Sequence, residues 1–532
     1  MYGFDMYASY NNRFVDVRAD YNNKGFYFSF ASYNWVDNSS FRNNSEADMG
    51  LYTSDGWWCP NYLSNVTGSG GRAIGYYYSP SNISNMNFSE LILCNADNST
   101  ITNVRVETYD TIKNNGVLGL LVDNSCFINL SSNYNDRGMK FQYSHYNNFS
   151  GIKIEYSKWD GVRFDDSSHN LIEDSFFNNT ELNDGLALYT SHNNKVSGVV
   201  ADSNTGGYGV YLQDSRDNSF SSLVLSRNHQ GFQLGVNSSH NNFTDVVAEG
   251  NTLFGGYISS VSSSSDSNIM DNVSARSNGW YGLYLDGVSS NIIRNSSIEN
   301  NTLYGIYLSD ASNNNITNCT IINSSAWDFY SAFNSTNNTV KNTRISQTKI
   351  SFTGLDIALK QTLNPPADPN GAANIGKYLN ITNNSAGSWI SLNISYLPSD
   401  LGGMNESKLK LFRYHGATWQ MVPGSAVNTV DDFVHANITS FSTFAPMVVK
   451  AESLRVHNLD SGFNYSTIQA AIDNANTLDG HTLSVDPGVY TENVVVNKSL
   501  IIKSASGNPS NTIVNASSSS SNVILITVIM YP

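Results

Sequence analysis

The chain has 532 residues and a formal net charge of −15 at pH 7, with 29 Lys and Arg against 44 Asp and Glu. Charged residues make up only 14% of it, whereas aromatic residues reach 12% and Asn, Ser and Gly are abundant. This length exceeds one ordinary domain, and the composition favours an extended all-β protein over a helical one. The acidic balance excludes nucleic acid and anionic membrane surfaces as expected partners.

Glycines recur through much of the chain at intervals of 22 to 26 residues. A period of this length predicts a solenoid, in which each coil is buried by the coils next to it. The series comprises Gly3 and Gly25, and then Gly116, Gly138, Gly161, Gly185, Gly209, Gly231, Gly256, Gly282 and Gly305.

Apolar residues follow these glycines at fixed offsets of one, three, eleven, fourteen and sixteen positions. The pairs at one and three and at fourteen and sixteen have a period of two, which is typical of short strands with one face turned inward. We therefore expect an interior of stacked aliphatic side chains. In the coil that begins at Gly209, the expected inward residues are Val210, Leu212, Phe220, Leu223 and Leu225.

Asparagines recur at two further places in each coil. Asparagine tolerates the left-handed backbone of a tight corner, and its amide can bond to the copy in the next coil. We interpret both sets as turn formers that fix the register, rather than as ligands. One set is Asn147, Asn170, Asn194, Asn218, Asn291 and Asn314, and the other is Asn204, Asn228, Asn251, Asn278 and Asn301.

Three segments with the pattern Tyr-Gly-x-Tyr-Leu begin at Tyr208, Tyr281 and Tyr304, and each is followed by an asparagine corner. They resemble the repeats of NosD-like right-handed parallel β-helix proteins. The resemblance extends over residues 3–345. It implies the fold, which hosts lyases, hydrolases, adhesins and structural proteins, and it implies no single function.

We predict an all-β protein with three parts: a right-handed parallel β-helix of about 15 coils over residues 1–348, a β-sandwich-like accessory domain over 349–450, and the truncated start of a second β-helix over 451–532. The second part follows a proline-rich break and reads as short alternating strands. Its "YHGATWQMVPGS" and "TSFSTFAPM" segments resemble an accessory domain of archaeal surface proteins, which implies extracellular display. The third part begins with a short helix striped by Ile468, Ile472 and Ala475, as a capping helix would be.

The chain opens directly in the repeat pattern, and its apolar end at residues 523–530 is far shorter than the roughly 20 residues that a membrane span needs. We therefore expect a fragment without its signal peptide or anchor. Many Asn-x-Ser/Thr sequons fit a glycosylated extracellular or cell-surface location. Examples are Asn82, Asn148, Asn178, Asn272, Asn334, Asn393 and Asn437.

The four cysteines are far apart and form no CxxC pair, so they indicate neither a zinc site nor a disulfide-dense scaffold. We expect them to be solitary buried thiols. They are Cys59, Cys94, Cys126 and Cys319.

A polysaccharide-cleaving enzyme needs converging carboxylates, or a basic residue beside a uronate. The best local cluster lies in "RFDDSSHN", and neighbouring coils could add His145, His192 and Asp214. Aspartate and histidine are also the normal composition of solvated turns. The Asn-Thr-Asp and Gly-His-Gly motifs of polygalacturonase-like hydrolases are absent, so no catalytic site is favoured. The candidate residues are Arg163, Asp165, Asp166 and His169.

Four histidines each follow a serine. They are candidate metal ligands, because the resemblance to NosD-like proteins implies a link with copper. Imidazoles near one corner could bind copper or zinc. Their offsets within the coil differ, however, and no Cys or Met joins them. We therefore predict no metal site and no cofactor. The histidines are His145, His169, His192 and His240.

Outward tyrosines form a further pattern. Tyr284 and Tyr307 occupy equivalent positions in consecutive coils, and Tyr211 has the same offset. Tyrosines one coil apart can stack on each other, or they can offer a platform for sugars. Trp57 and Trp58, in an irregular segment between residues 50 and 90, are further candidate ligand contacts.

These observations favour a non-catalytic extracellular protein with a structural, adhesive or glycan-binding role, and with polysaccharide or cell-surface glycans as partners. The alternative is a polysaccharide lyase or glycoside hydrolase that uses the Asp/His corner. Unpaired terminal coils could also pair with another chain, so self-association is a further expectation.

Overall fold

A computed structural model describes residues 1–108, 114–260, 265–369, 371–450, 454–518 and 520–527. The chain forms two compact units. The first comprises Met1–Ala367 and Asn374–Met447, and the second comprises Asp368–Ala373 and Val448–Pro532. In the described ranges no helix is long and apolar enough to cross a membrane.

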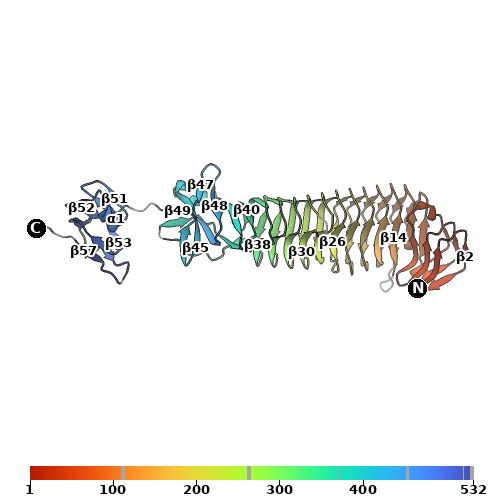
Figure 1. The fold of residues 1–532 in the computed structure, drawn as a ribbon. Coiled ribbons are helices and arrows are strands. Elements are labelled where there is room, and N and C mark those ends of the chain that lie inside the picture. Colours follow the sequence, from red (N-terminus) through yellow and green to blue (C-terminus); the bar gives the residue numbers. More distant parts are fainter. Residues whose placement is uncertain (109–113, 261–264, 370, 451–453, 519, 528–532) are drawn as a thin grey trace. The chain divides into compact units, whose positions relative to one another are not determined.

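Most of the first unit is a parallel β-helix whose coils stack one behind another (Figure 1). Each coil supplies three short strands, and each strand pairs in parallel with its counterpart in the next coil. The strands that follow the recurring glycines form one continuous ladder, which we call sheet A. Sheet A comprises β14 (Asn115–Leu120), β17 (Arg137–Gln142), β20 (Val162–Asp165), β23 (Leu186–Tyr189), β26 (Tyr208–Gln213), β28 (Gln230–Leu234), β30 (Phe254–Ser259), β32 (Tyr281–Asp286), β35 (Tyr304–Ser309) and β38 (Trp327–Ala332).

Two more parallel ladders complete each coil, and we call them sheets B and C. Sheet B includes β15 (Cys126–Ile128), β18 (Asn148–Ser150), β21 (Leu171–Glu173), β24 (Lys195–Ser197), β33 (Ile292–Arg294) and β36 (Asn315–Thr317). Sheet C includes β16 (Ser131–Asn133), β19 (Lys153–Glu155), β22 (Phe176–Asn178), β25 (Val200–Asp202), β34 (Ser297–Glu299) and β37 (Thr320–Ile322). Four longer strands run through both sheets: β27 (Ser219–Ser226), β29 (Asn242–Glu249), β31 (Ile269–Arg276) and β39 (Thr339–Ile345).

The inward positions predicted from the glycine offsets are confirmed. In the coil that begins at Gly209, all five predicted residues are buried. Glycine is required because neighbouring coils approach closely there: a Cβ on Gly161 would lie 2.6 Å from the carbonyl oxygen of Gly185, and one on Gly209 would lie 2.6 Å from that of Gly231. A side chain at these positions would therefore push the coils apart.

A ladder of buried asparagines confirms the predicted register lock. Asn170, for example, donates its backbone N–H and its Nδ2–H to Oδ1 of Asn194 at 2.8 and 3.1 Å, and Asn194 bonds to Asn218 in the same way. Asn194 thus accepts two hydrogen bonds at Oδ1 from Asn170, and it donates one from its backbone N–H and one from Nδ2 to Asn218. The ladder runs through Asn147, Asn170, Asn194, Asn218, Asn241, Asn268, Asn291, Asn314 and Asn338.

The second asparagine set forms a similar ladder. Asn204 donates its backbone N–H and Nδ2–H to Oδ1 of Asn228, both at 2.9 Å, and Asn278 bonds to Asn301 in the same way at 3.1 and 3.0 Å. Where a coil carries both ladders, as between Asn204 and Asn301, two of its corners are therefore tied to the next coil by amides that are shielded from water.

We expect Asn194→Ala to lower the free energy of unfolding of the first unit by about 2–4 kcal/mol, because it leaves two buried donors of Asn170 without an acceptor. Urea unfolding followed by circular dichroism measures the change. Asn87, an exposed asparagine at the start of β11 (Asn87–Cys94), provides the matched control. An Asn194→Ala variant as stable as Asn87→Ala would contradict the register role.

The expectation of four solitary thiols is wrong for two of them. Cys59 and Cys94 form a disulfide across 35 residues of sequence, whereas Cys126 and Cys319 are free. The disulfide closes the irregular segment that interrupts the coil pattern, next to the short 3-10 helix η1 (Gly56–Trp58). Sequence alone did not reveal the pairing because the segment departs from the repeat, so the register gives no distance between the two positions.

An antiparallel β-sandwich continues directly from the last coil. β40 (Thr348–Leu355) pairs antiparallel with β39, and β41 (Ile357–Gln361) pairs antiparallel with β38. The edges of the parallel sheets are therefore extended by the sandwich, which places both structures in one compact unit. One layer adds β44 (Trp389–Ser395), β47 (Ala426–Asn428) and β48 (Phe433–Ile438), and the other adds β43 (Leu379–Asn383), β45 (Leu409–His415), β46 (Thr418–Met421) and β49 (Ser442–Val449).

The second unit has the predicted helix followed by coils of a second β-helix. Helix α1 (Ile468–Asp473) packs into a core with strands β52 (Thr482–Val485), β53 (Gly488–Thr491) and β54 (Val494–Val496). These strands pair in parallel with β55 (Ile501–Ser504), β56 (Thr512–Asn515) and β57 (Ile524–Ile526), respectively. The predicted fold class is thereby confirmed.

Both ends of α1 are satisfied by the same coil. Glu492 accepts hydrogen bonds from the backbone N–H groups of Ile468 and Gln469 at 3.0 and 2.9 Å. Lys498 donates to the carbonyl oxygens of Ile472 and Asn474 at 2.6 and 2.8 Å. The carboxylate lies at the positive end of the helix dipole and the ammonium at its negative end, so both charges interact favourably with it. These contacts explain why a helix of only six residues is stable.

Candidate functional site

The outer face of sheet A carries three columns of outward side chains that run across the coils. They stand one residue before each inward glycine, two residues after it and four residues after it. The first column is Asn115, Arg137, Asp160, Asp184, Tyr208, Gln230, Phe254, Tyr281, Tyr304 and Trp327. The second is Leu118, Lys140, Arg163, Ala187, Tyr211, Gln233, Tyr257, Tyr284, Tyr307 and Tyr330. The third includes Gln142, Asp165, Tyr189, Gln213, Ser259, Asp286 and Ser309.

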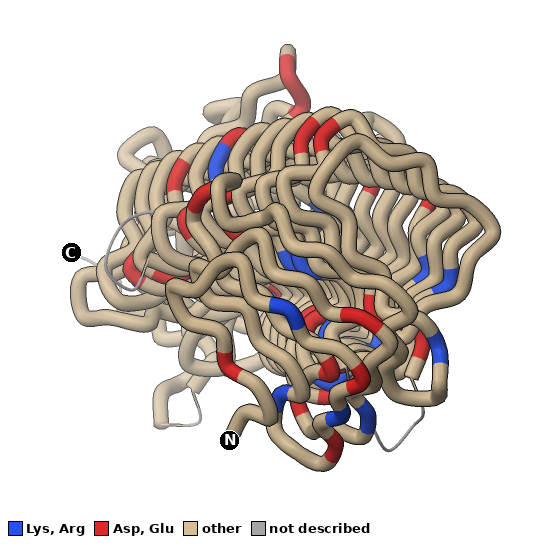
Figure 2. Tube along the Cα trace, turned by 90° about the vertical axis from the view of Figure 1, so that its right-hand side faces the viewer, with Lys and Arg blue, Asp and Glu red and all other residues tan. Residues whose placement is uncertain are grey.

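The face changes character along its length. Charged side chains over β17 and β20 give way to aromatic ones on β26 and from β30 onward, while β28 carries Gln230 and Gln233. Figure 2 shows acidic and basic positions on several sides of the coils. Within the three columns of sheet A, however, basic side chains occur only on β17 and β20. The concentration of charge at one end of sheet A is therefore a distinct feature, and we call it the charged cluster.

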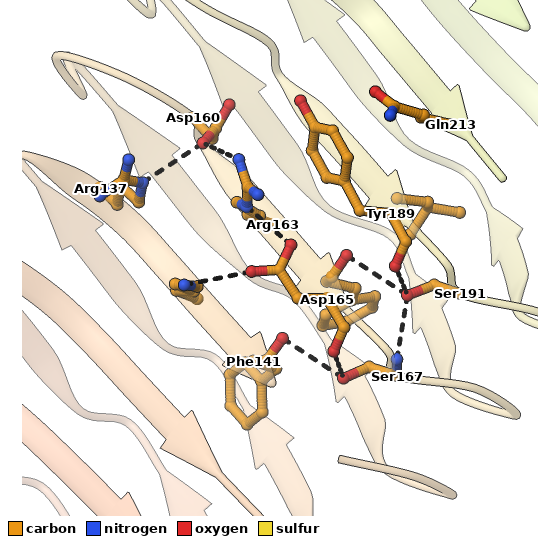
Figure 3. Close-up of polar contacts among 12 residues, drawn as sticks. Arg137, Phe141, Asp160, Arg163, Asp165, Ser167, Tyr189, Ser191 and Gln213 are labelled. Carbon is orange, nitrogen blue, oxygen red and sulfur yellow. Dashed lines mark hydrogen bonds and ion pairs between the residues drawn. The ribbon is translucent and has the colours of Figure 1, made fainter. Parts of the chain in front are cut away.

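Asp160 lies at the centre of the charged cluster and is fully buried. Its Oδ2 lies 3.4 Å from Nε of Arg137 and 3.8 Å from Nη1 of Arg163, and its Oδ1 accepts from Nδ2 of Asn183 at 3.2 Å. Arg163 also donates from Nε to Oδ1 of Asp165 at 2.8 Å (Figure 3). Lys140 completes the network at 3.1 Å from Oδ2 of Asp165. The carboxylates thus lie beneath cations that remain partly accessible.

Asp184 occupies the same column as Asp160, one coil further along. Its side chain is buried and accepts a hydrogen bond from the backbone N–H of Tyr208 at 2.9 Å. Burial, reinforced by the negative charge of Asp160, raises the pKa of Asp184 to about 8, although the Tyr208 N–H and Arg163 oppose the shift. The Asp184 carboxyl is therefore mostly protonated at neutral pH.

Arg163 also contacts the first aromatic ring of the face. Its guanidinium carbon lies 4.0 Å from the ring centroid of Tyr189, so the cation sits over the ring (Figure 3). Burial raises the pKa of the Tyr189 phenol, and the neighbouring Asp184 adds to the shift. Arg163 thereby joins the charged cluster to the tyrosines.

The tyrosines from β30 onward stack on one another along both columns. The rings of Tyr284 and Tyr307 are 4.8 Å apart and 3° from parallel, and those of Tyr257 and Tyr284 are 4.8 Å apart and 12° from parallel. In the first column, the rings of Tyr281 and Tyr304 are 5.1 Å apart and 15° from parallel. The flat faces of these rings are covered by one another, so the ring edges and hydroxyl groups are the parts that a ligand can contact.

A groove of about 550 Å³ lies beside the charged cluster. We call it the cationic groove because Lys24, Arg137, Lys140 and Lys158 all line it, together with Trp159. It extends from the outer side of β4 (Lys24–Ser29) and β7 (Ala47–Tyr52) to that of β14 and β17. Two acidic residues, Glu46 and Asp136, also line it, so the outer face of sheet A begins at a recess in which basic side chains outnumber acidic ones.

The four predicted corner residues are divided between two places. Arg163 and Asp165 belong to the charged cluster, whereas Asp166 and His169 lie on the turn after β20, both with left-handed backbones at φ 48 and 61°. The His169 ring stacks on that of Tyr146 at 4.8 Å and 4°. Burial and the charge of Asp165 raise the pKa of Asp166, so the two aspartates still interact.

The histidines beside this turn have structural partners. Nδ1 of His145 accepts from the backbone N–H of Ser168 at 3.1 Å, and Nδ1 of His192 accepts from that of Arg216 at 3.1 Å. Among the residues that the structure describes, no group of three or more His, Cys, Asp or Glu side chains could hold a metal ion.

The other predicted contacts lie in two regions. Tyr211, Tyr284 and Tyr307 are in the second column of sheet A, and the Tyr211 hydroxyl donates to Oε1 of Gln213 at 3.1 Å. Trp57 is 77% exposed in the irregular segment, whereas Trp58 packs edge-on against Phe30 with ring centroids 6.3 Å apart.

Sequence reasoning missed Asp160 and Asp184, which form the buried centre of the charged cluster. A signal was present, because both residues directly precede a recurring glycine and so share the column of Tyr208 and Tyr281. Their burial and ion pairs depend on side chains of neighbouring coils, which a single coil does not reveal.

Asp184→Asn should remove a pH dependence of stability. The unfolded carboxyl has a pKa near 3.9, so the folded state, with its raised pKa, binds this proton more tightly. The resulting stabilisation is fully present below about pH 4 and declines as the pH rises toward about 8. Calorimetry at about pH 5 and about pH 9 should show the Tm of the wild type falling relative to that of Asp184→Asn.

Asp217→Asn is the control for this measurement, because Asp217 is exposed on a turn with φ 57° that asparagine adopts readily. Its Tm should follow that of the wild type at both values of pH. If the Tm of Asp184→Asn also follows that of the wild type at both values of pH, the conclusion that Asp184 is protonated in the folded protein is refuted.

Comparison with known proteins gives two family matches. The model described as "Periplasmic copper-binding protein (NosD)" matches residues 97–273, and that described as "Right handed beta helix region" matches residues 249–391. A cell surface glycoprotein of Methanothermus fervidus is 43% identical over 76 residues, which are 14% of this chain and 12% of that protein. The two family models together span residues 97–391 and include all of sheet A.

Several solved structures are similar at low identity. The periplasmic alginate epimerase AlgG has a TM-score of 0.39 at 10% identity, covering 60% of this chain and 76% of its own. The Dettilon tailspike protein has a TM-score of 0.33 at 11% identity, covering 72% and 88%. The catalytic domain of a GH87 α-1,3-glucanase in complex with nigerose has a TM-score of 0.34 at 15% identity, covering 59% and 64%.

Proposed function

We propose that this chain, a NosD-like right-handed parallel β-helix protein, acts at the cell surface as a rod that binds polysaccharide along the outer face of sheet A. The observation that carries the proposal is the continuity of that face. Its three outward columns run from β14 to β38 with one position per coil, and the cationic groove adjoins their first coils. A long, regular polymer is the kind of ligand that can follow such a repeat.

The chemistry of the columns suits hydrogen bonding better than ring stacking. Because the faces of the Tyr284 and Tyr307 rings cover each other, contact with a sugar would come through phenol hydroxyls and ring edges. A tyrosine phenol is already neutral at neutral pH, and burial raises the pKa of Tyr257 and of Tyr281 further, to about 12 in each case. Neutral phenols can both donate to and accept from sugar hydroxyls.

The irregular segment could supply a complementary contact. Trp57 is more exposed than Tyr52 of the same segment, and a free indole face suits the apolar face of a sugar ring. The disulfide between Cys59 and Cys94 closes this segment, and disulfides persist in oxidising compartments outside the cytosol. This supports an extracellular location for the proposed contact.

The double substitution Tyr284→Phe/Tyr307→Phe tests the role of the hydroxyls. Phenylalanine retains the stacked rings but removes two hydrogen-bonding groups, so we expect binding to weaken by about tenfold, or 1–2 kcal/mol. A glycan array identifies the ligand, and titration calorimetry measures the change. Tyr146→Phe, which removes a hydroxyl from an exposed turn outside sheet A, should leave binding unchanged. Equal affinity of the double variant and the wild type would exclude these tyrosine hydroxyls as contacts for the polysaccharide.

Cleavage of a polysaccharide is the second candidate, and the aspartates of the charged cluster favour it. Asp184, with its pKa of about 8, stands one coil from Asp160, which lies between Arg137 and Arg163. A protonated carboxyl beside a second carboxyl is the arrangement that general acid–base chemistry on a glycosidic bond needs. Asp165 is the least buried of the three.

Incubation with uronate-rich and neutral polysaccharides tests this second candidate. Cleavage would release reducing ends or unsaturated products, and it should be lost in Asp160→Asn and Asp184→Asn and reduced in Asp165→Asn. Asp217→Asn is again the control, because it makes the same change on an exposed turn. Product release that is unaffected by the three cluster variants would place any cleavage elsewhere.

A further inference from the structure

The Asn-x-Ser/Thr sequons are distributed unevenly around the coils. The three outward columns of sheet A contain one asparagine between residues 115 and 332, Asn115, and it is followed by Gly and Val rather than by a sequon. Sequons recur instead on the turn between sheets B and C, and others lie in strands of sheets B and C and on the turns next to sheet A, such as Asn148, Asn300 and Asn334. The outer face of sheet A is free of acceptor motifs over the described coils, whereas the turn between sheets B and C presents one in each of four coils.

Four of the turn sequons share one conformation. They occupy the residue between a sheet B strand and a sheet C strand, or the equivalent bend of β31, and their asparagines are exposed with left-handed backbones. The third residue of each motif, a Ser or Thr, belongs to the sheet C strand that follows. The four are Asn129, Asn272, Asn295 and Asn318, with φ of 51, 53, 53 and 55°.

The side-chain amides of this column can carry a sugar without losing their contacts. Nδ2 of Asn272 donates to Oδ1 of Asp245 at 2.6 Å, and Nδ2 of Asn295 donates to Oδ1 of Asp271 at 2.8 Å. An amide has two hydrogens on this nitrogen, so replacing one by a sugar leaves the other available as a donor. The reaction therefore does not require the turn to unfold or its hydrogen bonds to be given up.

We infer that N-linked glycans are attached along the turn between sheets B and C, so that they cover this side of the rod and leave the outer face of sheet A bare. In each transfer, a bond forms between Nδ2 and the anomeric carbon of a diphosphate-activated glycosyl donor. The bond from that carbon to the diphosphate oxygen breaks, the diphosphate leaves with the electron pair, and the amide proton is released. The transferase is a separate enzyme. Glycan attachment does not depend on the proposed function, whereas the purpose of the bare face rests on it.

Mass spectrometry of intact glycopeptides from the protein isolated from its own cells tests the attachment. We expect glycans on the peptides that contain Asn129, Asn272, Asn295 or Asn318. In Asn295→Gln the glycan at that turn should disappear while the fold is kept, because the residue is exposed. Unmodified asparagines at all four turns, or glycans confined to sequons elsewhere, would overturn the inference.

A second experiment tests the bare face. Tyr307→Asn creates a new sequon in the second column of sheet A, because Leu308 and Ser309 follow it, and Tyr307→Gln makes a similar polar change without creating one. In the protein's own cells, the first variant should gain a glycan and lose polysaccharide binding at least tenfold relative to the second. Equal binding by both variants, with the glycan present on Tyr307→Asn, would show that the polysaccharide does not bind along the outer face of sheet A.

The two experiments fail separately. If the wild type binds no polysaccharide, the proposed function falls, whereas the mass of the turn glycopeptides still decides the attachment. If the turns carry no glycan but polysaccharide binds, the inference falls and the proposed function stands.

Discussion

The hydrogen bond between asparagine amides of successive coils is the interaction on which the β-helix depends. Along a ladder, Oδ1 of one asparagine accepts hydrogen bonds from the backbone N–H and the side-chain Nδ2–H of the asparagine one coil earlier, as Asn194 does from Asn170. The amides are buried, so a slip of one residue would leave several donors and acceptors unsatisfied. Hydrophobic burial drives the coils together, but apolar contacts alone are not directional. The amide ladder supplies the direction and thereby fixes which residues of every coil face outward.

Fixed register has consequences on the outer face of sheet A. Side chains at one position of the repeat meet their copies one coil away, so identical residues stack, as Tyr284 does on Tyr307. Where the residues differ, they form contacts that a single coil cannot encode. Asp160 and Asp184 are neighbours in one column, and burial, reinforced by the charge of the Asp160 carboxylate, raises the pKa of Asp184. The same geometry thus produces an aromatic array at one end and an ion-pair network at the other.

The ends of a parallel solenoid are its weak points, because they expose unpaired strand edges. In the first unit, antiparallel strands β40 and β41 extend the last coil into a sandwich, and no separate cap is needed there. In the second unit, helix α1 packs over the strand core instead, and Glu492 and Lys498 from a single coil satisfy its two ends. The two units therefore use different structures to cover sheet edges and cores.

The sequence by itself determined the repeat, the inward aliphatic positions and the asparagine corners, because each of these is a local pattern that recurs in every coil. It also identified the capping helix and the alternating strands of the sandwich, and it placed Tyr284 and Tyr307 in equivalent positions. Only the tertiary structure decided the partners of residues that do not repeat. Cys59 meets Cys94 across an irregular segment, and Asp160 is buried by arginines from its own and the preceding coil. Asp165 belongs to the charged cluster, whereas Asp166 lies on the turn that follows β20. The physical reason is that these contacts depend on how coils of different sequence lie against each other, whereas the periodic pattern describes only what the coils have in common.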